Sequence, residues 1–130
     1  MLKILPIETK DEQARIMGLC SIEYNLNALA YAAYDDGVLV GAAQFLLKGA
    51  TCHIIDIANA DGVDDEEALF IMGRGLLNFV DLCGIHDAYL DVPEKVSEAL
   101  RARIGFFDDG KGVYYMNLRG FFTKHHGEGH

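Results

Sequence analysis

A helical segment between two apolar, strand-like runs constrains the fold of this chain more than any other feature. Residues 51–58, TCHIIDIA, are β-branched and apolar, which predicts a central strand that is buried on both faces. Residues 64–83 carry apolar side chains at helical spacing, and Gly84 follows as a stop signal. Residues 88–92 then predict another strand. Parallel strands joined through one helix have a right-handed crossover, so we expect residues 51–58 and 88–92 to be neighbouring central strands.

The N-terminal residues predict a strand followed by a short helix. Residues 2–7 are mostly apolar and read as the strand. Thr9 followed by Glu12 is a capping-box pattern, which opens a helix that we expect to end at about Cys20.

The residues between this helix and the central strand predict an antiparallel meander. Residues 29–34 and 38–47 are apolar and partly alternating, and the DDG sequence at 35–37 is a strong hairpin signal between them. The KGA sequence at 48–50 predicts a second turn. Three strands should therefore lie side by side.

The C-terminal residues predict one more helix and a closing strand. Pro93 opens a helix that we expect to run through about Arg103, and a glycine-bearing turn leads to a strand at 113–118. This order of elements predicts an α/β (α+β) fold with a mixed sheet and helices packed on it. We expect one domain over residues 1–122 and a disordered, His-containing tail over residues 123–130.

The net charge limits the partners of this chain. The formal charge is −9 and the sequence pI is near 4.8, so the molecule repels phosphate backbones and anionic membrane surfaces. We therefore expect no nucleic acid and no membrane as partner. A homo-oligomer is compatible with the sequence.

The cysteines indicate a reducing compartment. Cys20, Cys52 and Cys83 are odd in number and form no CxxC pair, which argues against a disulfide framework and a zinc knuckle. Apolar neighbours predict that Cys52 and Cys83 are buried. The N-terminal residues lack a signal-peptide pattern, so we expect a cytoplasmic protein. We also expect no metal site.

The C-terminal half resembles a known superfamily. The segment LCGIHDAYLDVPEKVSEALRARIGFF, with its corner at Ile104-Gly105-Phe106, and the closing run VYYMNL are similar to the GNAT superfamily of acyl-CoA-dependent N-acyltransferases. The order of elements over residues 2–118 agrees with it. The resemblance implies a GNAT-like fold that moves an acetyl group from acetyl-CoA to an amine. It implies that the main chain of Ile55, Ile57 and Ala58 aligns the pantetheine arm.

Two functional positions of that superfamily are altered in this chain. The glycine-rich motif that cradles the pyrophosphate, R/Q-x-x-G-x-G/A, is replaced by GVDDEE at residues 62–67. The simplest explanation of the acids is that Asp61 or Asp64 caps the helix while Glu66 and Glu67 complement its dipole; a hard-cation site is the alternative. The position of the tyrosine acid, four residues before Gly105, is Arg101. A tyrosine from elsewhere, Tyr89, Tyr114 or Tyr115, could replace it only if the fold brings one to the cleft.

His53 and Asp56 are the titratable residues of the strand on which the superfamily often places a general base. They are three positions apart, so strand alternation predicts that they face opposite sides of the sheet. Asp56 is the better candidate because it lies closer to the start of the helix.

Three functions remain open at this point. The first is N-acetyl transfer to a small-molecule amine or a basic peptide, which the negative charge suits. The second is a non-catalytic GNAT-fold module that binds a small ligand or a protein, since the cradle and the tyrosine acid are missing. The third is a structural homo-oligomer.

Overall fold

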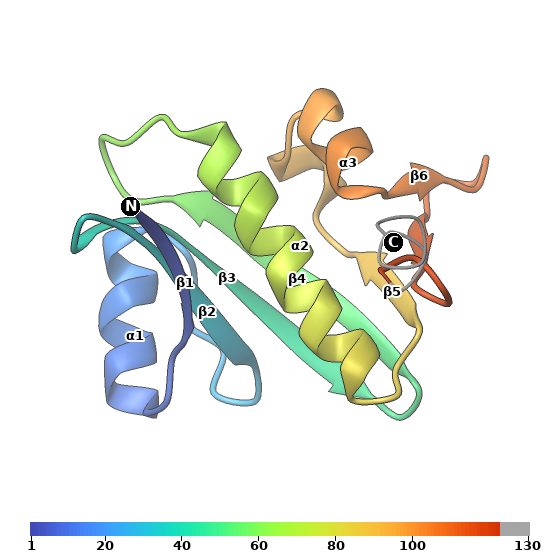
Figure 1. Cartoon of the computed structure of the whole chain (residues 1–130), viewed down its shortest axis with the longest axis horizontal. Helices are drawn as coiled ribbons and strands as arrows, with labels where there is room; N and C mark the ends of the chain where they lie inside the picture. The colour runs from blue at the N-terminus through green and yellow to red at the C-terminus, as the bar shows by residue number, and fades with distance from the viewer. Residues whose placement is uncertain (123–130) are drawn as a thin grey trace, which may run out of the picture.

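One mixed β-sheet organises the chain (Figure 1). The structure is a computed structural model, and it describes residues 1–122. Its strands are β1 (Leu2–Pro6), β2 (Leu29–Asp35), β3 (Val38–Lys48), β4 (Thr51–Asn59), β5 (Asp87–Leu90), β6 (Phe107–Asp108) and β7 (Tyr114–Asn117). Its helices are α1 (Lys10–Leu19), α2 (Glu66–Leu82), α3 (Glu98–Ile104) and the 3-10 turn η1 (Pro93–Lys95). The strand order across the sheet is β1-β2-β3-β4-β5-β7-β6.

The predicted pair of central strands is confirmed. β4 and β5 are parallel neighbours, in register from Thr51 opposite Asp87 to Ile54 opposite Leu90. The other pairings among residues 1–122 are antiparallel, including the predicted meander of β2, β3 and β4. The fold class predicted from the sequence, a mixed α/β sheet with packed helices, is therefore correct.

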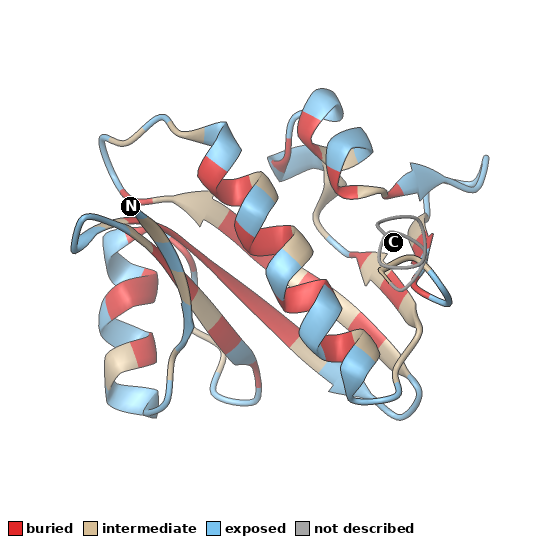
Figure 2. Cartoon of the chain, viewed as in Figure 1, coloured by how far each residue is buried: buried red, intermediate tan, exposed pale blue. Residues whose placement is uncertain are grey.

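Helices cover the two faces of the sheet unequally. α2 and α3 pack on one face over most of the sheet, while α1 packs on the other face against β2 and β3. Ala42 and Ala43 illustrate the alternation, because the first is buried against α1 and the second against α2. Figure 2 shows the buried residues of α1 and α2 as stripes along each helix.

The two principal helices begin where their capping residues stand. The Thr9 side chain accepts a hydrogen bond from the Glu12 N–H at 3.2 Å, as the capping-box pattern predicts. Asp65 caps α2 by accepting from the Ala68 N–H at 3.0 Å. The expectation that Asp61 or Asp64 would cap this helix is therefore wrong.

Three further sequence predictions about secondary structure and burial differ from the structure. The single helix expected from Pro93 to Arg103 is broken, because the backbone of Val96 is extended and Ser97 caps a new helix with its side chain. β4 is not buried on both faces, since Thr51, His53 and Ile55 are half-buried. Cys83, expected to be buried, is exposed. The tail expected at residues 123–130 lies outside the described residues.

No helix among residues 1–122 combines the length and the apolar character needed to cross a bilayer.

Candidate functional site

β4 and β5 separate at the centre of the sheet. Their pairing ends at Ile54 opposite Leu90, and the Asp91 N–H then donates to the Ile54 carbonyl at 3.0 Å. β4 continues to Asn59, paired with β3 alone. Within the described residues, no strand covers the other edge of β4 from residue 55 onward.

A β-bulge at Ile55 changes which side chains face each side of β4. Gln44 of β3 lies opposite Asp56 and Phe45 lies opposite Ile54, so Ile55 has no partner across the ladder. An extra residue shifts the alternation of side chains by one position. The bulge therefore turns Asp56 toward the α1 face, the face of its partner Gln44.

His53 faces the same side, because its neighbours Cys52 and Ile54 are buried against α2. The prediction that His53 and Asp56 lie on opposite faces is therefore wrong. Strict alternation would have required an unbroken ladder between β3 and β4.

Asp56 lines a cavity of about 440 Å³ beside the opening. The cavity residues are Glu23, Tyr24, Asn25, Leu26, Gln44, Ile55, Asp56 and Lys95. The Asp56 side chain is 12% exposed; one carboxylate oxygen accepts from the Ile57 N–H at 3.1 Å, and the other lies 3.6 Å from Lys95 Nζ. A carboxylate next to one flexible ammonium can accept a proton from a substrate and keep a counter-charge nearby.

A buried amide network holds the wall of this cavity. Gln44 Oε1 accepts from Gln13 Nε2 at 2.8 Å and from the Asn25 N–H at 3.1 Å. Gln44 Nε2 donates to the Glu23 carbonyl at 2.9 Å. The loop between α1 and β2 is therefore fixed to β3 by hydrogen bonds. Gln44 was not predicted as a site residue, although a glutamine inside an apolar strand is a visible signal.

His53 occupies a neighbouring cavity of about 470 Å³, which Tyr89, Asp91 and Tyr114 also line. Its Nε2 is hydrogen-bonded to Thr51 Oγ1 at 3.1 Å, its Nδ1 to Asp91 Oδ1 at 3.1 Å, and its ring stacks on Tyr89. Both ring nitrogens are thus engaged, and His53 does not line the Asp56 cavity.

Arg101, at the position of the tyrosine acid, has a structural role. Its guanidinium donates to the Pro93 carbonyl and to the Val96 carbonyl, and lies 4.7 Å from the centre of the Tyr114 ring. Tyr115 donates to Asp87, whose pKa the Arg119 guanidinium and this hydroxyl together lower to about 2. None of the three candidate tyrosines lines the Asp56 cavity.

The junction between β4 and α2 is closed by one asparagine. Asn59 Nδ2 donates to the Val40 carbonyl at 2.9 Å and to the Asp65 carbonyl at 3.0 Å, and Asn59 Oδ1 accepts from the Asp65 N–H at 3.1 Å. The amide thereby ties both sides of the loop to the end of β4.

Further hydrogen bonds attach the junction to α1 and to itself. The Asp61 N–H donates to the Leu19 carbonyl at 2.8 Å, and the Asp61 side chain accepts from Ser21 Oγ at 2.6 Å. The Val63 N–H donates to the Ala60 carbonyl at 2.9 Å. The loop is therefore internally satisfied at several of its donors.

The first turn of α2 uses its acids to hold α3. Glu66 accepts from Ser97 Oγ at 2.9 Å, and Glu67 forms an ion pair with Arg103 at 2.8 Å, which lowers the pKa of Glu67. Among residues 1–122 no group of three or more metal-ligating side chains comes together. Asp65 therefore caps α2, while Glu66 and Glu67 connect it to α3.

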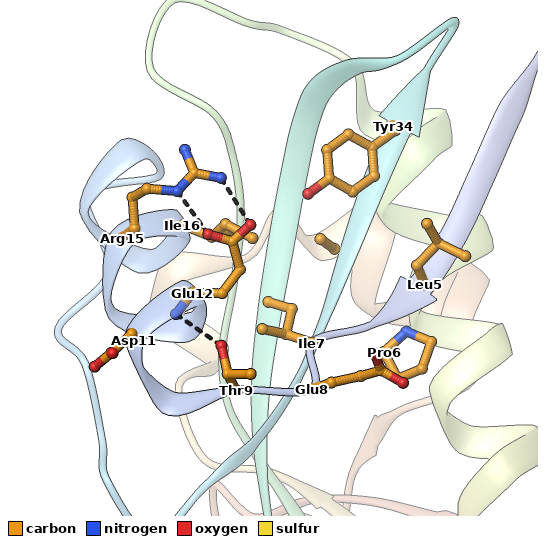
Figure 3. Close-up of a pocket in the computed structure, with 11 residues that line it drawn as sticks. Leu5, Pro6, Ile7, Glu8, Thr9, Asp11, Glu12, Arg15, Ile16 and Tyr34 are labelled. Atoms are coloured by element: carbon orange, nitrogen blue, oxygen red, sulfur yellow. Dashed lines mark hydrogen bonds and ion pairs between the residues drawn. The ribbon is translucent and has the colours of Figure 1, made fainter.

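A separate hollow of about 580 Å³ lies between α1 and the edge strand β1 (Figure 3). Part of its polar rim is paired, because Arg15 donates to Glu12 at 2.7 Å and the Glu12 N–H donates to Thr9. Glu8 and Asp11 also line this hollow as exposed carboxylates, but it lies at the edge strand and away from the opening between β4 and β5.

The buried cysteines do not provide a nucleophile. Burial raises the pKa of the Cys52 thiol to about 12 and that of the Cys20 thiol to about 11. Both thiols are therefore neutral at physiological pH, whereas the nucleophilic form of cysteine is the thiolate.

Comparisons with solved structures identify the fold. An IAA acetyltransferase from Bacillus cereus superposes with a TM-score of 0.68 at 17% identity, covering 91% of this chain and 100% of that one. A spermidine N-acetyltransferase from Vibrio cholerae gives 0.70 at 13% identity, with 95% and 98% coverage. A GNAT family acetyltransferase from Brucella melitensis in complex with acetyl-CoA gives 0.67 at 12% identity, with 91% and 88% coverage. No protein-family model and no curated protein sequence matches the chain.

The chain therefore has the GNAT fold, as the sequence resemblance predicted. The two parts of acetyl-CoA fit this chain differently. The uncovered edge of β4 after Ile54 can pair with the amides of a pantetheine arm. The β4–α2 junction fits a diphosphate poorly, because several of its donors are used internally and its side chains are acidic.

Proposed function

We propose that this chain is an N-acetyltransferase that moves an acetyl group from a pantetheine thioester, such as acetyl-CoA, to an amine. The observation that carries the proposal is the geometry at Ile55. There β4 leaves β5, bulges, and presents the buried Asp56 carboxylate to a cavity at the opening.

The main chain of β4 positions the donor. The peptide groups of Ile55, Ile57 and Ala58 lie where β5 no longer pairs with β4. They align the pantetheine arm through main-chain hydrogen bonds, as the edge of a sheet aligns an added strand. An arm aligned in this way would bring its thioester carbonyl to the bulge, beside the Asp56 cavity.

The transfer step is direct attack by the neutral amine, which forms when the ammonium group of the acceptor first loses one proton to solvent. The nitrogen lone pair forms a C–N bond to the thioester carbonyl carbon, the C–S bond breaks, and its electron pair leaves with sulfur as a thiolate. Asp56 accepts the proton that the nitrogen loses, directly or through one water molecule. The thiolate takes its proton from solvent, because Arg101 stands where a tyrosine would supply one.

The acceptor is a cationic amine, either a small molecule or a basic peptide. Glu23 and Asp56 place carboxylates at the cavity, and the net charge of −9 attracts positive substrates. The structurally similar spermidine N-acetyltransferase is named for an amine of this kind.

The test is a transfer assay, read by mass spectrometry, with monoamines, polyamines and lysine peptides as acceptors. We expect Asp56→Asn to lower turnover by about 10²-fold or more, as loss of a general base does. Asp11→Asn, an exposed carboxylate of α1, is the matched control. Unchanged turnover in Asp56→Asn would remove Asp56 from the mechanism, and a loss confined to His53→Gln would assign the base to His53.

A second candidate is a non-catalytic GNAT-fold module that binds a small ligand or a protein. The closed junction and Arg101 at the acid position favour it. Absence of transfer to every amine, together with calorimetric binding of an amine to the Asp56 cavity, would support this candidate over the enzyme.

A further inference from the structure

We infer that the donor is recognised through its acyl-pantetheine arm alone, so that the substrate class is acyl thioesters of pantetheine with or without the ADP part of CoA. This inference rests on the proposed function. It concerns the junction between β4 and α2, at the far end of the arm.

Four main-chain donors of the junction are already used, while those of the first two residues of α2, Glu66 and Glu67, lie among acidic side chains. A diphosphate at a helix start is held by N–H groups that point at its oxygens. Four junction N–H groups donate within the protein, namely those of Asp61, Val63, Asp65 and Ala68. A diphosphate would have to break these bonds before it could be bound by the same groups.

The charge of the junction opposes a diphosphate as well. Asp61, Asp64, Asp65, Glu66 and Glu67 bring carboxylates to the loop and to the first turn of α2. Phosphate oxygens need donors, whereas carboxylates offer acceptors and like charge.

The nearby arginine does not offset this charge. Arg103 is paired with Glu67 at 2.8 Å, and the Glu67 partner raises the pKa of the guanidinium. Glu66 is held by Ser97. These contacts tie α2 to α3, so recruiting Arg103 to a phosphate would break a contact between the two helices.

The edge of β4 that we propose binds the pantetheine arm remains open. β4 has no β5 partner after Ile54, and its pairing with β3 continues to Asn59. β4 therefore offers main-chain groups to the pantetheine arm, whereas the junction offers acidic side chains to the ADP part.

The experiment compares S-acetylpantetheine, S-acetyl-4′-phosphopantetheine and acetyl-CoA as donors to one amine. We expect kcat/KM values within about threefold of one another. Acetyl-CoA favoured by about thirtyfold or more would overturn the inference while leaving the proposed transfer intact.

Calorimetric titration with the three free thiols is run in parallel: equal dissociation constants support the inference, and much tighter binding of CoA contradicts it. Transfer from none of the donors would defeat the proposed function, and binding of none of the thiols would defeat both.

A variant pair tests the cause. Asp64→Asn with Glu66→Gln leaves the Asp65 cap in place, and Asp11→Asn with Glu8→Gln removes the same charge from the start of α1. We expect the first pair alone to raise kcat/KM for acetyl-CoA severalfold at low salt, with S-acetylpantetheine unchanged, because screening hides surface repulsion at higher salt. Equal effects of the two pairs would contradict a local role for the acids.

Discussion

Replacing Gln44 by Met tests whether the amide network holds the wall of the Asp56 cavity. Gln44 is 1% exposed and makes three hydrogen bonds, to Gln13, to the Asn25 N–H and to the Glu23 carbonyl. Methionine has a similar length and volume but can make none of them. The change therefore removes hydrogen bonds with little change in packing.

The expected loss follows from the groups left without a partner. The Asn25 N–H and the Glu23 carbonyl lose Gln44, whereas Gln13 Nε2 keeps the Asn25 and Ala28 carbonyls, both at 3.3 Å. A buried polar group without a partner costs about 1 to 3 kcal/mol, and these two are partly buried. We therefore expect the free energy of unfolding to fall by about 2 to 3 kcal/mol, or roughly 10 °C in Tm for a domain of this size.

The assay is urea unfolding followed by circular dichroism, with Asn78→Ala on the exposed side of α2 as a control. Gln13→Met and the double variant complete a cycle. Their coupling should be about 0.5 to 1.5 kcal/mol, because Gln13 and Gln44 bond directly at 2.8 Å. A loss below about 1 kcal/mol for Gln44→Met would refute the conclusion that the amide network holds the cavity wall.

Three further outcomes are expected. The pKa of Asp87 is lowered to about 2 by Arg119 and Tyr115, so the stability that this carboxylate adds is present above about pH 4 and is lost as pH falls to about 2; Asp87→Asn should flatten that part of an acid-unfolding curve. A thiol reagent should label Cys83 in the native protein and the other two cysteines only after unfolding, which mass spectrometry can count. Gly75→Ala should stabilise α2 by about 0.5 to 1 kcal/mol in thermal unfolding, whereas Gly73→Ala should not, because its Cβ would lie 3.0 Å from Ile104 Cδ1.

Local signals predicted most of the fold. The turns at 35–37 and 48–50, the Thr9 cap and the apolar face of α2 each depend on a few neighbouring residues, and each is present in the structure. The parallel pairing of β4 with β5 followed from a helix between two apolar strands. The turns and the cap are predictable because the residues that form them are close together in the sequence. The strand pairing is predictable because a helix between two strands allows few topologies.

The site was less predictable because it depends on pairing between distant residues. The bulge at Ile55 exists only relative to Gln44 and Phe45 of β3, and nothing within 51–58 marks it. The choice of Asp65 as the cap likewise depends on Asn59, which holds the loop through the Asp65 N–H and carbonyl. A pattern within one segment cannot specify either contact.

The departures from regular structure gather around one cavity. The bulge turns Asp56 toward it, and the break before Ser97 ends η1 at Lys95, whose Nζ lies 3.6 Å from Asp56. Arg101 holds η1 through two carbonyls while its buried Nε has no hydrogen-bond partner, a destabilising feature in the described part of the chain. Proteins commonly break local rules at functional sites, where the surrounding structure must hold the irregularity in place. This concentration of irregular features favours the Asp56 cavity, rather than the larger hollow beside α1, as the site of the proposed function.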